Sequence, residues 1–196
     1  MANEQGPVER YNITLDELLK MERDILIRRH VERYAMVRQH IYGSVLDFAC
    51  GVGYGSYLIS KNPDVQEVIG VDKDQDAINH ATLHFKTNKT RFLVSDIENY
   101  SGTHNCFVCL ETIEHIKNSS LVPALAIRCG VELTILSYPS KKTTHYNPFH
   151  YHDFRLQDIK DLFSEFLVTD VRDLHGEVTM VFLLGKHNRS LKDIRK

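Results

Sequence analysis

The sequence predicts an α/β domain built on a mostly parallel sheet, and three features support this class. Short apolar runs of strand length alternate with longer amphipathic segments from about residue 43 onward, an order typical of parallel strands joined by crossover helices. Several of these runs end in an acidic residue, and a loop with three closely spaced glycines follows the first. We therefore expect seven strands, helices on both faces, and a ligand site at the carboxyl ends of the strands.

The segment before the sheet, residues 13–40, reads as a helix. Thr14 followed by Glu17 has the spacing of a capping box, which marks a helix start. Apolar residues mark one face and charged residues occupy the others, as in a solvated amphipathic helix: Leu18, Met21, Ile25 and Ile27 form the apolar set.

The chain divides into an N-terminal helical arm or cap, residues 1–42, and one globular domain, residues 43–196. Within these limits, residues 1–11 and the basic end of the chain, residues 186–196, are expected to be loosely held. We find no internal repeat and no low-complexity linker.

The expected strands and helices follow from apolar runs and turn residues. Strands are predicted near 44–49, 67–72, 91–95, 106–111, 131–137, 167–173 and 178–185, and helices near 54–61, 74–85, 119–129 and 155–165. Only the hairpin-length segment 174–177 separates the last two strands, so the final strand should run antiparallel to its neighbours.

The glycine loop indicates that a ligand lies directly against the backbone. Gly51, Gly53 and Gly55 alternate with other residues just after a predicted strand, and glycine permits both close approach and positive φ angles. The N–H groups that open the following helix point toward such a ligand. Asp47, four residues before Gly51, would repel phosphate and suits a cation or an amine.

The next apolar runs also carry acids at their ends. Asp72 lies 19 residues after Gly53, close to the separation at which an acid accepts hydrogen bonds from ribose hydroxyls. Asp96 ends the third run, and the fourth run leads into the segment 111–116, Glu-Thr-Ile-Glu-His-Ile.

These four motifs, in this order and spacing, resemble those of the class I methyltransferases, which bind S-adenosylmethionine (SAM). The resemblance implies a Rossmann-like fold with an antiparallel last strand and a helical cap, and it implies SAM as the cofactor. Asp47 and the glycine loop would hold the methionine part, Asp72 the ribose, and Asp96 with the Ile97 N–H the adenine. The cofactor-binding set expected on this basis is Asp47, Ala49, Gly51, Gly53, Gly55, Asp72, Lys73, Asp96, Ile97, Leu110 and Glu111.

Two further segments resemble bacterial methyltransferases that act on sugars and related small metabolites. One is His30–Ala35 together with Ala49–Ser56, and the other is the Asn147-Pro148-Phe149-His150 segment. The resemblance implies methyl transfer to a small-molecule hydroxyl. Two alternatives stay open: methylation of an amine or protein group, and a SAM-binding regulator that transfers no methyl group.

A hydroxyl acceptor requires a general base, and histidine is suited to that role near neutral pH. His115, just after the fourth strand, and His150, in the loop after the fifth, are the main candidates. His145 and His152, in the same loop as His150, are further candidates for the base. These three loop histidines and Asp153 could also be read as a metal site, but their spacing matches no metal motif. We therefore assign no metal ligands and leave open whether a divalent metal assists.

Composition limits the remaining possibilities. The chain has 196 residues, 42% of them hydrophobic and 26% charged, with a net charge of −2; this describes an ordinary globular protein with no strong attraction to nucleic acid. No apolar run reaches the length of a membrane span, and the first residues lack a signal-peptide pattern. Four cysteines fall in or beside apolar runs, as expected of buried thiols in a reducing compartment. We expect a cytoplasmic enzyme whose partner is a small acceptor, without nucleic acid or membrane, and leave a homodimer open.

Overall fold

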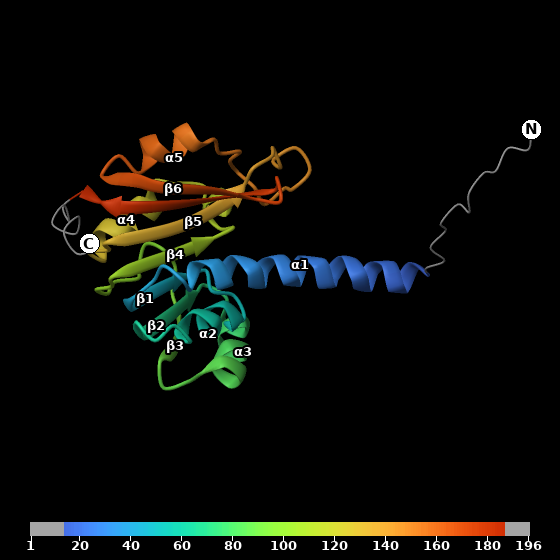
Figure 1. Ribbon diagram of the computed structural model, residues 1–196, viewed down its shortest axis with the longest axis horizontal. Helices are drawn as coiled ribbons and strands as arrows, with labels where there is room; N and C mark the ends of the chain where they lie inside the picture. Colours follow the sequence, from blue (N-terminus) through green and yellow to red (C-terminus); the bar gives the residue numbers. More distant parts are fainter. Residues whose placement is uncertain (1–13, 187–196) are drawn as a thin grey trace, which may run out of the picture.

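The computed structural model describes residues 14–186 and contains a seven-stranded sheet in the order β3-β2-β1-β4-β5-β7-β6 (Figure 1). The strands are β1 (Gly43–Phe48), β2 (Val65–Asp72), β3 (Thr90–Val94), β4 (Cys106–Leu110), β5 (Leu133–Pro139), β6 (Phe166–Leu174) and β7 (Val178–Gly185). β1 to β5 pair in parallel, whereas β7 pairs antiparallel with both β5 and β6. The predicted fold class, including the antiparallel last strand, is confirmed.

The helices cover both faces of this sheet. They are α1 (Leu15–Val37), α2 (Tyr54–Ser60), α3 (Gln75–Phe85), α4 (Leu121–Arg128) and α5 (Leu156–Leu162), with a short 3-10 helix, η1 (Ile113–His115), after β4. The end of α1 and α2 pack on one face, with α3 beside α2, and α4 and α5 pack on the other (Figure 1).

Two apolar clusters form the core because successive strand residues point to opposite faces. On β1, Leu46 faces the cluster under α4 and α5, whereas Val45 faces the cluster under α1 and α2. On β4, Cys109 faces the first of these clusters and Cys106 faces the second. All four cysteines are free and buried, as expected. Burial of the central strands on both faces explains why their sequences are almost continuously apolar.

The N-terminal helix begins at its predicted cap. Thr14 Oγ1 accepts from the Glu17 N–H, and the Glu17 carboxylate accepts from the Thr14 N–H at 2.8 Å, which completes the capping box. Of the ends expected to be loosely held, residues 1–11 and 187–196 lie outside the described residues, whereas the Lys186 N–H donates to the Glu165 carbonyl at 3.0 Å. No helix of the described chain is long and apolar enough to cross a membrane.

Most of α1 projects away from the sheet (Figure 1). Only Arg33, Tyr34 and Val37 of this helix are buried, because the helix reaches the body of the domain at its last turns. The predicted apolar face is therefore solvent-exposed, with Leu18, Met21, Ile25 and Ile27 each about half exposed. An ion pair of Arg29 with Glu177 and a hydrogen bond between His175 and Glu32 join α1 to the β6–β7 hairpin.

Candidate active site

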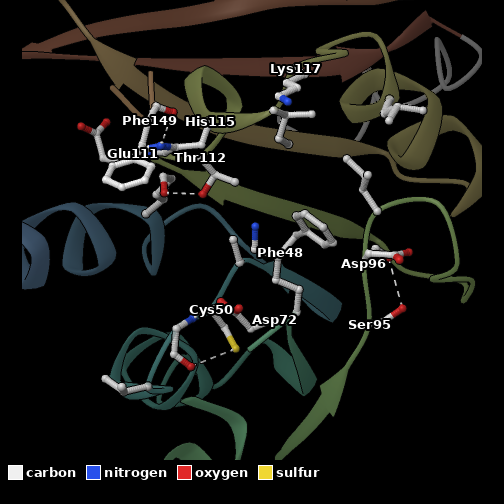
Figure 2. A pocket seen from close by; sticks show the side chains of 18 of the residues that line it. Phe48, Cys50, Asp72, Ser95, Asp96, Glu111, Thr112, His115, Lys117 and Phe149 are labelled. Atoms are coloured by element: carbon white, nitrogen blue, oxygen red, sulfur yellow. Dashed lines mark hydrogen bonds between the residues drawn. The ribbon is translucent and has the colours of Figure 1, made fainter. Parts of the chain in front are cut away.

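A cavity of about 920 Å³ opens at the carboxyl ends of β1 to β4. In the strand order, β1 lies between β2 and β4, so successive connections leave it in opposite directions and create a crevice at this edge. The cavity is within the size range of small-molecule sites. Figure 2 shows Asp72 and Asp96 on one side, and Glu111, His115 and Phe149 gathered on the other.

The three glycines of the loop have different structural roles. Gly51 lines the cavity with φ +54°, and a Cβ added there would meet no atom within 4 Å, which leaves room for a ligand. At Gly53, an added Cβ would lie 2.5 Å from the Ala81 Cβ, and at Gly55 it would lie 2.1 Å from the Tyr34 ring. Gly51 therefore keeps the cavity open, while the other two glycines allow α3 and α1 to pack against α2.

Asp47 lies beneath the glycine loop and does not line the cavity. Its side chain has no exposed surface, and it accepts hydrogen bonds from Ser56 Oγ at 2.6 Å and from the Tyr34 hydroxyl at 3.2 Å. Burial raises the pKa of this carboxyl to about 7, although both hydrogen bonds oppose that shift. Asp47 thus joins β1 to α1 and α2.

The acids at the ends of β2 and β3 do line the cavity. Asp72 accepts from the Gly51 N–H at 2.9 Å and from the Asp74 N–H at 3.0 Å, so it connects the end of β2 to the glycine loop. Asp96 is exposed, and its carboxylate accepts from Asn99 at 2.8 Å. The next residue, Ile97, is buried in the cavity wall.

Two non-glycine residues with positive φ stand side by side at the centre of this edge. Ala49 follows β1 with φ +59°, and Glu111 follows β4 with φ +48°. Ser137 of β5 holds Glu111 in place: its hydroxyl donates to Glu111 Oε1 at 2.7 Å, and its carbonyl accepts from the Glu111 N–H. Strained residues held by their surroundings are typical of functional sites.

The loop between β5 and α5 docks on η1 and brings distant residues together. The Tyr151 N–H donates to the Glu114 carbonyl at 2.8 Å, and His115 Nδ1 donates to the Phe149 carbonyl at 2.9 Å. As a result the rings of His115 and His150 meet edge to face, with centroids 4.4 Å apart.

The remaining loop histidines lie elsewhere. His145 is exposed and packs against Tyr146, outside the cavity lining. His152 bonds through Nε2 to the carbonyls of Ile116 and Lys117, both at 3.1 Å, which attaches the loop to the segment after η1.

Buried ionisable groups concentrate near this histidine pair. Glu114 is 1% exposed, and burial raises its pKa to about 8, with the nearby Glu111 contributing. Burial likewise raises the pKa of Glu111. Arg33, 7% exposed, lines the same cavity and favours ionisation of both carboxyls, yet no ion pair within 4 Å joins it to any described residue.

Glu114 and Arg33 were not among the site residues predicted from sequence. Both lie in segments that the sequence singled out, 111–116 and 30–35, but their burial depends on how α1 and η1 pack.

Most of the predicted site residues surround this cavity. Eight of the cofactor set line it, namely Ala49, Gly51, Asp72, Lys73, Asp96, Ile97, Leu110 and Glu111, and His115 does as well. Asp47, Gly53 and Gly55 support the loop from behind, and His150 touches the cavity through His115.

One known family is similar to the part of the chain that surrounds much of the cavity. Residues 45–128, which run from β1 to the end of α4 and include the glycine loop, match the family model described as a methyltransferase domain. This match spans somewhat less than half of the 196 residues, and it includes the ends of β1 to β4 that surround the cavity. No curated protein sequence matches the chain.

Solved structures share the fold over nearly the whole chain. The magnesium protoporphyrin IX methyltransferase of Synechocystis, solved with bound S-adenosylhomocysteine (SAH), has a TM-score of 0.69 at 17% identity, covering 91% of this chain and 90% of its own. The N-methyltransferase NodS of Bradyrhizobium japonicum, also with SAH, has a TM-score of 0.64 at 10% identity, covering 81% and 86%. The chain thus shares the fold of these methyltransferases.

Proposed function

We propose that the protein transfers the methyl group of SAM to a hydroxyl of a small metabolite, a sugar or a related compound. The observation that carries this proposal is the order of groups along one cavity. Acids that suit ribose and adenine stand at the β2 and β3 ends, and a histidine pair stands at the β4 and β5 ends. A cofactor lying across the glycine loop would present its methyl group to the histidine side.

For the cofactor, we assign the ribose to Asp72 and the adenine to Asp96 and the Ile97 N–H. Asp72 already bonds the Gly51 N–H, so one carboxylate can connect ribose and loop. We assign the methionine carboxylate to Arg33, because a buried guanidinium in the wall is a strong partner for it. Asp47 supports the loop from below.

For the acceptor, the exposed aromatic residues at the cavity mouth offer a binding surface. Phe149 is 70% exposed and Tyr151 is 47% exposed, and both line the cavity. Flat aromatic surface suits the apolar face of a sugar ring. We propose that α1 and residues 1–42 cap the domain formed by residues 43–196 and complete the acceptor side, since His30 and Arg33 of α1 line the cavity.

Transfer to oxygen requires removal of a proton, and we assign that activation to His115 and His150. The test is SAH formation with matched hydroxyl and amine acceptors, using His115→Asn and His150→Asn beside the exposed-loop control His145→Asn. We expect turnover on hydroxyls, reduced roughly 100-fold in the two cavity variants with SAM affinity retained.

Turnover on amines alone, insensitive to both cavity variants, would favour N-methylation instead. SAM binding without turnover on any acceptor would favour a regulator. The four free buried cysteines suit a reducing compartment, and we propose a cytoplasmic location.

A further inference from the structure

Three potential metal ligands meet on the histidine side of the cavity. Glu114 and His115 come from η1, and His150 comes from the loop after β5. Each offers one ligand atom, and the three atoms lie within 4.8 Å of one another. This set differs from the three loop histidines whose spacing argued against a metal, and it exists only because the loop docks on η1.

The carboxyl group of Glu114 has an unsatisfied oxygen. Its side chain is buried, and Oε2 has no hydrogen-bond partner among residues 14–186. A buried polar atom left without a partner costs about 1–3 kcal/mol. Glu111 adds a second carboxyl nearby, and Arg33 is the cation that faces both. A bound cation would satisfy the orphaned oxygen and both acids.

Both histidines are oriented as metal ligands usually are. The Phe149 carbonyl can only accept, so His115 Nδ1 carries the proton and leaves the Nε2 lone pair open. His150 Nδ1 bonds Thr143 Oγ1 at 2.5 Å, and neither Nε2 atom bonds another described residue. A ring nitrogen held by the backbone or by another side chain, with the opposite nitrogen open, is the arrangement that fixes histidines for coordination.

We propose that Glu114, His115 and His150 bind a divalent transition-metal cation, with the remaining coordination positions open to the cavity. Two imidazoles and one carboxylate are the ligands of catalytic zinc sites and of other open metal sites. The proposal deepens the proposed function and rests on it for the identity of the bound hydroxyl.

The chemistry of such a site suits a hydroxyl acceptor. A divalent cation lowers the pKa of an oxygen that it binds. The acceptor hydroxyl loses its proton to water, its oxygen forms a bond to the methyl carbon, and the carbon–sulfur bond breaks with its electron pair left on sulfur. The products are the methyl ether, SAH and one proton. In this reading the histidines activate the hydroxyl by holding the cation.

The test is metal binding by the full-length protein after treatment with a chelator. Zn²⁺, Mn²⁺ and Mg²⁺ are titrated separately by calorimetry, and Co²⁺ is titrated with its visible absorption bands as an independent readout. We expect one transition-metal ion per chain. Affinity should fall at least tenfold in Glu114→Gln and His150→Asn and stay unchanged in His145→Asn, a histidine of the same loop outside the cluster.

The proposal would be overturned if none of these cations bound the wild type. It would also be overturned if Glu114→Gln, His150→Asn and His145→Asn all bound the cation with equal affinity. Glu114 is buried, so its variant could fold poorly; His115→Asn and His150→Asn, at less buried positions, then decide the outcome. SAM is titrated into the same samples. SAM binding without metal binding refutes only the metal site, whereas metal binding without SAM binding refutes only the proposed function.

Discussion

Asp47 is a carboxyl group with no exposed surface, held by two hydroxyls beneath the glycine loop. Its position shows how a single residue at a strand end can order three elements. Desolvation favours the protonated form of such a group, and the hydrogen bonds from Ser56 and Tyr34 recover only part of the cost of ionisation.

This environment predicts a pH dependence of stability. The pKa of Asp47 is about 7 in the folded protein, against 3.8 for a free aspartate. Between these values the unfolded chain has lost a proton that the folded protein keeps, so the free energy of unfolding should fall as pH rises. The slope from this group is at most about 1.4 kcal/mol per pH unit, and it ends above pH 7.

The measurement is urea unfolding at several pH values between 4 and 8 for the wild type and for Asp47→Asn. The amide cannot ionise but can still accept a hydrogen bond, so the difference between the two curves isolates this carboxyl. We expect a shallower pH slope in the variant. Identical slopes would mean that Asp47 ionises normally in the folded state.

The position of Gly55 has no room for a larger side chain. An added Cβ would lie 2.1 Å from the Tyr34 ring, which is buried and bonded to Asp47. Gly55→Ala should therefore destabilise the protein by about 1–3 kcal/mol through overpacking. In a Tyr34→Ala background the ring is gone, so the same substitution should cost clearly less. Equal costs in both backgrounds, measured as a double-mutant cycle, would exclude this contact as the cause.

At the scale of elements, α1 combines two environments along one helix. Leu26 is 53% exposed on the projecting part, whereas Val37 is fully buried at the last turn. Leu26→Ala should change the free energy of unfolding by no more than about 0.5 kcal/mol. Val37→Ala should cost about 2 kcal/mol through lost burial and a residual cavity. A large loss in Leu26→Ala, measured by urea unfolding, would show that the projecting part packs on something in solution.

Most helices and strands could be predicted from the sequence, but the solvent exposure of α1 could not. The capping box at Thr14 and Glu17, the apolar strands and the short last hairpin depend on local chemistry, which the sequence contains in full. The exposure of the apolar face of α1 does not depend on local chemistry alone. Periodicity predicts that a helix has an apolar face, but not which surface that face contacts.

The meeting of Glu114 with His150 could not be predicted for a related reason. It depends on backbone hydrogen bonds between the loop and η1, such as the one from Tyr151 to Glu114, and backbone groups are the same in every sequence. The acids at the strand ends were predictable because parallel strands bring their carboxyl ends to one edge.

On the scale of the whole molecule, the sheet topology brings site residues that are distant in sequence to one cavity. The reversal of strand order at β1 opens the crevice, and the strand ends place Asp72, Asp96 and Glu111 around it although they are far apart in sequence. We therefore expect this cavity to bind SAM with Asp72 as a direct partner.

The most direct measurement is calorimetric titration of SAM and SAH into the wild type, Asp72→Ala and Asp64→Ala. Asp64 is an exposed acid away from the cavity and serves as the matched control. We predict binding of both compounds, weakened about tenfold or more in Asp72→Ala through loss of a charged hydrogen bond and unchanged in Asp64→Ala. Failure of the wild type to bind either compound would exclude this cavity as a SAM site, and equal affinity in all three proteins would exclude Asp72 as a direct partner.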